Sequence, residues 1–234
     1  MNTLEIYNDT EIDLENIKKD VSIQIEKFKK LPLIKKVFTL LEDLPKDIKY
    51  HNKKHAEDVL HEAVLFATID NLNEAEKENI AVAATMHDMG FLFKREHNEK
   101  EAVRFIDEGL SKEEFGDLDI ESIKKMILDT EVKMTEKGPS IIMSYSGSAY
   151  LLDADVSDFG RTDFKEKSRL IKEELHIDLN DYISELNFLE STLSLMQNQV
   201  WHTLAANKLR QKQKLINIKE LKEEIVNLKI KVQG

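Results

Sequence analysis

The sequence predicts an all-α fold. Of its 234 residues, 34% are charged and 41% are hydrophobic, and only seven are glycine and three proline. This composition favours helices over the many turns of an all-β protein. Apolar residues also recur every three or four positions along most of the chain, which is the period of a helix with one buried face. We therefore expect a single all-α domain over residues 1–234.

The helices are expected in this order. Apolar spacing predicts a first helix that ends near Phe28, and Pro32 begins a second helix that ends before Pro45. Helical spacing returns over about 51–72 and 74–88, and Gly90 ends that regularity. Further helices are expected around 103–106, 120–127, the later part of 144–160, 183–200 and 218–232, with loops at 91–98 and 135–140.

Charge and composition exclude several classes of function. A net charge of −11 argues against nucleic acid as the main partner. Cysteine is absent, which excludes disulfides and thiolate metal sites. No run of eighteen apolar residues could span a membrane, and the first twenty residues are polar and acidic, unlike a secretory signal. We expect a cytoplasmic protein. The heptad-like spacing of 218–232 permits a homodimer, although a helix that docks on its own core is favoured.

Three of the seven histidines fall in two short segments, HNKKH (51–55) and ATMHDMG (84–90). Residues four apart share a helix face, so His51 and His55 would face one cavity if the helix includes both. His87 and Asp88 lie at the end of a predicted helix, where both could turn toward one point. Imidazole and carboxylate together suit divalent ions such as Mn, Fe, Co, Ni, Zn or Mg.

A third segment, LLDADVSDFG (151–160), carries Asp153 and Asp155 in an apolar stretch. Burying an unpaired carboxylate costs several kcal/mol, so such a group is expected to meet a cation. A metal ion would compensate these charges, and its candidate ligands are His55, His87, Asp88 and Asp155. Spacing alone leaves the alternative open, in which each histidine is an ordinary hydrogen-bonded core residue.

Taken in order, YHNKKHAEDVL (50–60), ATMHDMG (84–90) and LLDADVSDFG (151–160) resemble the HD-domain superfamily of metal-dependent phosphohydrolases. The first segment is also similar to the opening signature of cyclic-nucleotide phosphodiesterases. The nearest likeness is to the bacterial stand-alone predicted metal-dependent HD phosphohydrolases, through GRTDF (160–164) and NFLESTLSLMQNQVWHTLAANKLR (187–210).

The likeness spans about residues 30–225. It implies an HD-domain helical bundle with extra N- and C-terminal helices. The motif-bearing core would cover about 30–165, and a helical extension would cover about 166–234.

The resemblance also implies roles for single residues. The metal ligands would be His55, His87, Asp88 and Asp155, with Asp88 also taking part in catalysis. His51 would stand beside them as a proton donor. His97 would bind a second metal or the substrate, although Asn98 replaces the glutamate that often follows in relatives. Glu131 replaces a basic residue after Thr130, so an anion contact is expected to be missing.

Other residues near the motifs have two interpretations each. Lys53, Lys54, Lys94 and Arg95 could bind phosphate, although solvated charges are the ordinary interpretation. Asp58 and Asp153 could each accept a hydrogen bond from a metal-binding side chain and so orient it, or could cap a helix. Trp201 is expected in the core, although with His202 it could edge the pocket.

The function expected from these residues is a metal-dependent phosphohydrolase that cleaves a small phosphoester, with a nucleotide as the expected substrate. A bound divalent ion would supply hydroxide from its water. One alternative is a non-catalytic nucleotide-binding sensor or scaffold. Another is a di-iron HD-type oxygenase, for which His97 is the only additional histidine between the His87–Asp88 pair and Asp155.

Overall fold

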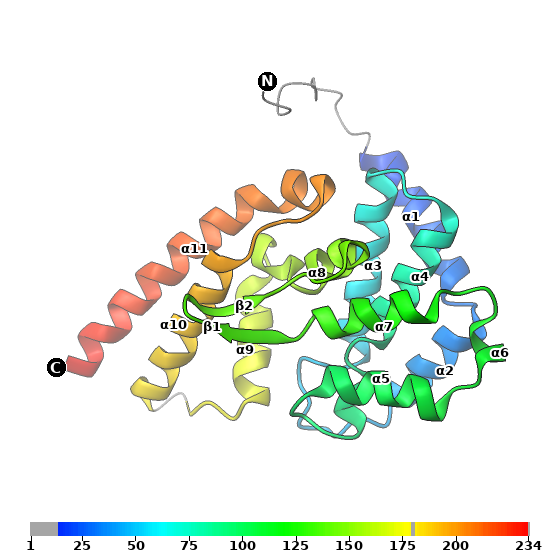
Figure 1. Cartoon of the computed structure of the whole chain (residues 1–234). Coiled ribbons are helices and arrows are strands. Elements are labelled where there is room, and N and C mark those ends of the chain that lie inside the picture. Colours follow the sequence, from blue (N-terminus) through cyan, green and yellow to red (C-terminus); the bar gives the residue numbers. More distant parts are fainter. Residues whose placement is uncertain (1–13, 179–180, 234) are drawn as a thin grey trace.

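The computed structural model describes residues 14–178 and 181–233, and helices make up most of this part of the chain (Figure 1). The α-helices are α1 (Leu14–Phe28), α2 (Pro32–Leu41), α3 (Lys53–Ile69), α4 (Glu74–Met86), α5 (Asn98–Gly109), α6 (Lys112–Phe115), α7 (Ile120–Asp129), α8 (Ala149–Asp155), α9 (Phe164–Glu174), α10 (Tyr182–Asn198) and α11 (Leu204–Gln233). Three short 3-10 helices are η1 (Met89–Leu92), η2 (Ser146–Ser148) and η3 (Ser157–Gly160). The all-α prediction is confirmed. The acidic first thirteen residues lie outside the described part.

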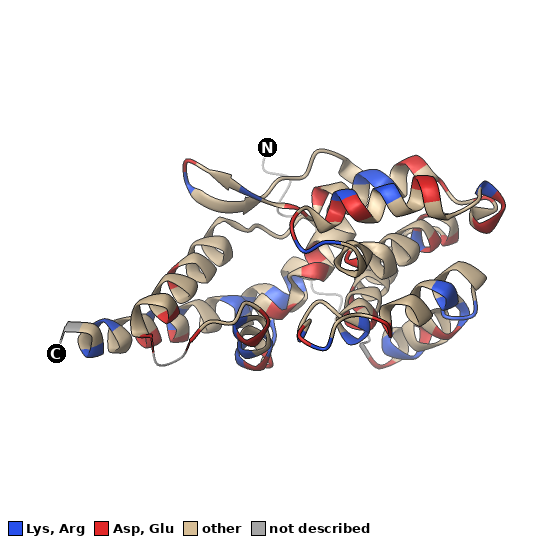
Figure 2. Ribbon diagram, turned by 90° about the horizontal axis from the view of Figure 1, so that it is seen from below, with Lys and Arg blue, Asp and Glu red and all other residues tan. Residues whose placement is uncertain are grey.

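One feature differs from the expected loop at 135–140. Strands β1 (Val132–Thr135) and β2 (Gly138–Ile141) form a short antiparallel hairpin. Gly138 adopts a φ of 97°, which glycine tolerates and which closes the turn. The Asn198 amide donates to the carbonyls of Lys137 and Pro139, at 2.9 and 3.1 Å, and so ties the hairpin to α10. Figure 2 shows the hairpin standing out to one side of the helices.

Helix α3 lies at the centre of the fold, packed against α1, α4, α8 and α11. Most of its residues from His55 to Ala67 are buried, because neighbours cover it on several sides. Helix α4 is equally enclosed, from Ile80 to Met86. An enclosed helix is held rigidly, so the side chains at the ends of α3 and α4 have fixed positions.

The C-terminal helices build a second hydrophobic cluster. On α11, Leu221, Ile225 and Leu228 are buried against Leu189 and Met196 of α10. The prediction that the heptad-like tail docks on its own core is confirmed, so these residues are occupied within the chain. Trp201 packs against both clusters, as expected of a core residue.

Two buried acids fix α11 against the rest of the fold. Asp153, on α8, accepts hydrogen bonds from the backbone N–H groups of His202 and Thr203, at 2.8–3.0 Å, and so caps the start of α11. Glu62, on α3, receives Nε and Nη2 of Arg210 at 2.6–2.9 Å. Of the two roles expected for Asp153, the structure therefore shows helix capping.

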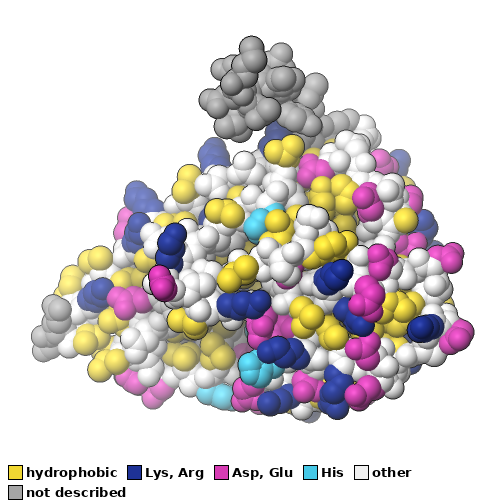
Figure 3. Space-filling view, viewed as in Figure 1, with side chains coloured by type: hydrophobic (Ala, Val, Ile, Leu, Met, Phe, Trp, Pro, Cys, Tyr) yellow, Lys and Arg dark blue, Asp and Glu magenta, His cyan; other side chains and the backbone are white. Residues whose placement is uncertain are grey.

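Within the residues that the structure describes, no helix has the length and apolar character needed to cross a membrane. On the face drawn in Figure 3, hydrophobic side chains are scattered among charged ones. The most exposed of the large hydrophobic residues is Met134, in the hairpin, at 78%.

Replacing Arg210 by Met should destabilise the fold by about 3 kcal/mol, because Glu62 would keep a buried charge without its partner. The double variant Glu62→Met/Arg210→Met should recover most of that loss, because no uncompensated charge remains. Denaturant unfolding of both variants measures the effect. Equal destabilisation of the single and double variants would contradict it.

Candidate metal centre

The start of α3 determines where His55 lies. The Asn52 side chain accepts hydrogen bonds from the backbone N–H groups of Lys54 and His55, at 2.9 and 3.4 Å. This cap starts the helix at Lys53, so His51 lies outside it. The condition for a shared helix face, a helix that includes both histidines, is therefore not met. His51 approaches the same region from the bend before the cap.

The end of α4 turns two adjacent side chains toward one point. The helix ends at Met86, His87 is its C-cap, and Asp88 leaves the helical conformation with φ −98° and ψ 7°. The Nδ1 atom of His87 lies 2.8 Å from the carbonyl oxygen of Ala84. That carbonyl accepts a hydrogen bond from the Nδ1–H group, so the Nε2 atom is left to face the centre.

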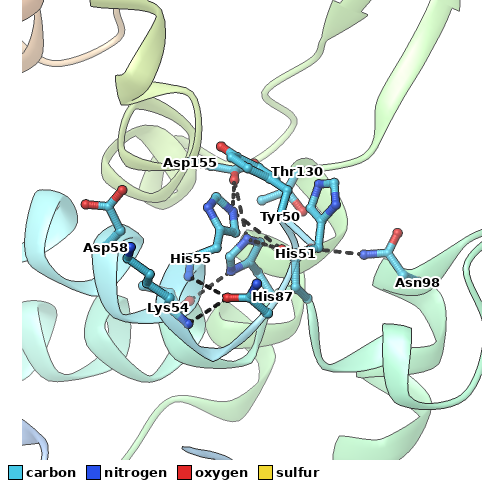
Figure 4. Close-up of polar contacts among 12 residues, drawn as sticks. Tyr50, His51, Lys54, His55, Asp58, His87, Asn98, Thr130 and Asp155 are labelled. Carbon is cyan, nitrogen blue, oxygen red and sulfur yellow. Dashed lines mark hydrogen bonds and ion pairs between the residues drawn. The ribbon is translucent and has the colours of Figure 1, made fainter. Parts of the chain in front are cut away.

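Asp155, at the last residue of α8, completes the group (Figure 4). Its Oδ1 atom lies 3.2 Å from Nε2 of His55 and 3.3 Å from Nε2 of His87. Asp88 brings its Oδ2 atom within 3.0 Å of Nε2 of His87 and 3.5 Å of Nε2 of His55. The structure thus brings together the four candidate ligands, from three segments distant in sequence.

The chemistry of this group fits a divalent cation. One ligand atom each from His55, His87 and Asp155 all lie within 4.8 Å of one another. Nε2 of His87 and Oδ2 of Asp88 are buried and form no hydrogen bond of good geometry. Buried polar atoms normally have a partner, and unpartnered nitrogen and oxygen atoms that face one point are suited to a metal ion.

Charge coupling within the group is strong. Burial disfavours protonation of His87, but the carboxylates of Asp88 and Asp155 outweigh it and raise the His87 pKa well above its ordinary value. Burial lowers the pKa of His55. The imidazoles hold the pKa of both carboxyls below the ordinary range despite burial. A divalent cation bound here would displace the proton from His87.

His51 stands beside this group and is held by Glu174, the last residue of α9. Its Nδ1 atom lies 2.5 Å from Oε1 of Glu174, and the backbone N–H groups of Tyr50 and His51 donate to Oε2 at 2.7 and 3.1 Å. The imidazole stacks on Phe91, with ring centroids 4.7 Å apart. Burial opposes protonation of His51, but Asp88 and Glu174 outweigh it and raise its pKa above the usual value.

Asn98 holds Asp88 from the other side. Its Nδ2 atom donates to Oδ1 of Asp88 at 3.2 Å, and Asn98 is itself buried. Its backbone packs closely on Gly90: a Cβ atom at Gly90 would lie only 1.8 Å from the Asn98 carbonyl oxygen. Gly90 is therefore needed for this close approach and not for an unusual φ.

His97 is not part of the group of ligand atoms. Its side chain is 61% exposed, and Nδ1 lies 3.3 Å from Oε1 of Glu131. Lys100 reaches the same oxygen at 3.5 Å. Thr130 caps the end of α7 and donates its hydroxyl to the carbonyl of Ile127. Glu131 is thus paired with His97 and Lys100.

The four candidate phosphate-binding cations have varied surroundings. Lys53 pairs with Glu42, and Arg95 pairs with Asp47 at 2.6 Å. Lys94 is exposed. Lys54 lines a pocket of about 320 Å³ that His55 also borders.

Asp58 pairs with two basic residues and not with the candidate metal ligands. It receives Arg161 and Lys167, each at 2.8 Å. Asp58 therefore ties α3 to α9 and the segment before it.

Sequence reasoning missed Glu174, and it noted Asn98 only as a departure from a family pattern. Nothing near Glu174 marks it, because its contact with His51 joins residues 123 positions apart. Asn52 did carry a usable signal, since asparagine is among the preferred N-cap residues.

Mn²⁺ should stabilise the protein, because the ion binds the folded state and not the unfolded chain. At a hundred times the dissociation constant the gain is about 2.7 kcal/mol. Thermal unfolding with and without Mn²⁺ measures it, and EDTA should reverse it. His87→Ala should lose the shift, whereas Asp58→Asn should keep it, because Asp58 pairs with Arg161 and Lys167. An undiminished shift in His87→Ala would contradict this ligand assignment.

Comparison of the chain with protein-family models gives no match, and comparison with curated proteins gives no significant match. The functional interpretation therefore depends on the geometry of the candidate metal centre and on the three sequence segments that supply it.

Proposed function

We propose that the chain is a metal-dependent phosphohydrolase of the HD-domain type, acting on a small phosphoester in the cytoplasm. The observation that carries this proposal is the approach of His55, His87, Asp88 and Asp155 to one point from three distant segments. Their order along the chain is the one that the resemblance to HD phosphohydrolases implies.

The ligand set has the donor types for a catalytic divalent ion. An ion held by these four residues would lower the pKa of its bound water and would neutralise phosphoryl oxygens. The four side chains are 82–99% buried, and Asp155 is the most exposed at 18%. The side chain of His51 is 29% exposed. Substrate would therefore approach past His51 and Asp155.

His51 would donate a proton to the leaving oxygen. Glu174 holds Nδ1, so the Nε2 side of the ring is the one available for proton transfer. Asp88 and Glu174 raise the pKa of His51 against the effect of burial, which favours the protonated imidazole that a general acid requires. The stacked ring of Phe91 limits its rotation.

A small phosphorylated substrate, with a nucleotide as the first candidate, suits the charge distribution. Acidic and basic residues are interspersed along the helices (Figure 2), and the net charge is −11. A surface of this kind does not favour a nucleic-acid backbone. Of the four candidate phosphate-binding cations, Lys54 is the one that lines the pocket bordered by His55.

The activity test uses the full chain loaded in turn with Mn²⁺, Co²⁺, Ni²⁺ and Mg²⁺ and assayed on a panel of phosphomonoesters and phosphodiesters. Metal-dependent release of phosphate or of a nucleoside monophosphate is expected. His87→Ala and Asp88→Ala should each lose more than the roughly 10–100-fold that removal of an outer-shell partner costs. Full activity in either variant would refute the proposal. Tight nucleotide binding without turnover would favour a sensor instead.

His51→Ala should lower kcat by about 10²–10⁴-fold, the usual contribution of general acid catalysis, while Mn²⁺ affinity stays near that of the wild type. His61→Ala is the matched control, because His61 follows the motif segment directly on α3 but its ring is 47% exposed. Steady-state kinetics and calorimetric Mn²⁺ titration separate the two effects. An unchanged kcat in His51→Ala would contradict the role of His51 as the proton donor.

A further inference from the structure

The two oxygens of Asp88 have different partners. Oδ2 faces the imidazoles of His87 and His55, at 3.0 and 3.5 Å. Oδ1 accepts the hydrogen bond from Nδ2 of Asn98 at 3.2 Å. The carboxylate is therefore divided between the candidate metal centre on one side and a neutral amide donor on the other.

This division bears on the number of ions. In two-metal sites the ions are about 3.5–4 Å apart, and a carboxylate that joins them gives one oxygen to each. An N–H group directed at Oδ1 of Asp88 uses one of that oxygen's lone pairs and presents positive partial charge to any second cation. A second cation is thereby disfavoured on the side of Asp88 where it would have to bind.

Asn98 is not free to turn away. It is buried and begins α5, and its carbonyl group lies directly over Gly90. The backbone N–H groups of Phe93 and Lys94 both donate to the Gly90 carbonyl at 2.9 Å, which closes the loop between Asp88 and α5. The backbone that carries the Asn98 amide is therefore fixed beside Gly90.

Among the described residues, the side chains around the centre do not form a second group of convergent ligand atoms. Across residues 14–178 and 181–233, the only group of three or more convergent histidine and acidic ligand atoms is His55, His87 and Asp155. Glu174 is bonded through both oxygens to Tyr50 and His51. Glu131 pairs with His97 and Lys100. Burial and neighbouring acids, Asp88 and Asp155 among them, raise the pKa of Glu99. Burial and the charge of Asp155 raise the pKa of Asp158, which accepts a hydrogen bond from the Tyr50 hydroxyl at 3.5 Å.

We propose that this centre holds one divalent ion per chain and that Asn98 excludes a second ion by occupying Oδ1 of Asp88. The proposal rests on the metal centre of the proposed function and not on the phosphohydrolase reaction. Asn98 acts here as a positioning residue, because it reaches the ion only through Asp88.

The test counts ions. The full chain, stripped with a chelator, is titrated with Mn²⁺ by calorimetry, and the loaded protein is examined by electron paramagnetic resonance. One ion per chain is expected, with the spectrum of an isolated Mn²⁺. A stoichiometry of two, or the spectrum of an exchange-coupled pair, would overturn the proposal.

Variants at position 98 test the role of the amide. Asn98→Asp replaces the N–H donor with a carboxylate and should raise the stoichiometry toward two, with coupled Mn²⁺ signals. Asn98→Ala frees Oδ1 of Asp88 without adding a ligand, so the first ion should bind about 10–100-fold more weakly and a second should bind only at much higher Mn²⁺ concentration. Glu99→Gln should leave both the stoichiometry and the spectrum unchanged. Thermal unfolding of each variant without metal checks that it folds.

Failure of this inference is distinct from failure of the proposed function. Two ions in the wild type together with phosphoester hydrolysis would overturn only the single-ion proposal. One ion with no hydrolysis of any phosphoester would overturn only the phosphohydrolase. No binding of Mn²⁺, Co²⁺, Ni²⁺ or Mg²⁺ would overturn both. An Asn98→Asp variant that still binds one isolated ion would contradict the role given to Asn98.

Discussion

The burial of two carboxylates beside two imidazoles is the constraint on which the rest of the structure depends. Asp88 and Asp155 are largely withdrawn from solvent, and a carboxylate there is tolerated only with positive charge at hand. The end of α4, the end of α8 and the first turn of α3 each contribute one part of this balance. A proton on His87 or a divalent cation can supply the positive charge. The atoms that balance charge in the fold are therefore also the candidate ligand atoms.

The groups around the centre are held by atoms that do not face it. His87 is fixed through Nδ1 by a carbonyl, His51 through Nδ1 by Glu174, and Asp88 through Oδ1 by Asn98. Each side chain therefore keeps one atom for the centre and uses the other to set its orientation. Such preorganisation lowers the entropy cost of binding an ion. A centre for one ion would also leave a di-iron oxygenase without its second iron.

Much of the helical framework could be predicted from local patterns, because apolar spacing and proline positions act over a few residues. The start of α2 at Pro32 and the docking of Leu221, Ile225 and Leu228 follow from such patterns. The four candidate ligands could also be named, since each lies in a short motif. The contacts of Glu174 could not, because they depend on how α9 returns to the start of α3. The hairpin escaped prediction because each strand is four residues long, and Pro139 and Gly138 are typical of loops.

The cap that Asp153 provides for α11 has a consequence for the whole C-terminal third of the chain. Asp153 precedes Asp155 by two residues on the same short helix, and its carboxylate is completely buried. Its hydrogen bonds come from His202 and Thr203. Removing the chain from His202 onward would leave that carboxylate without its donors in an apolar interior and would loosen the turn that carries Asp155. The segment that leads into the last helix is thus a structural support of the candidate ligands, and the smallest unit able to hold them together extends well past Asp155.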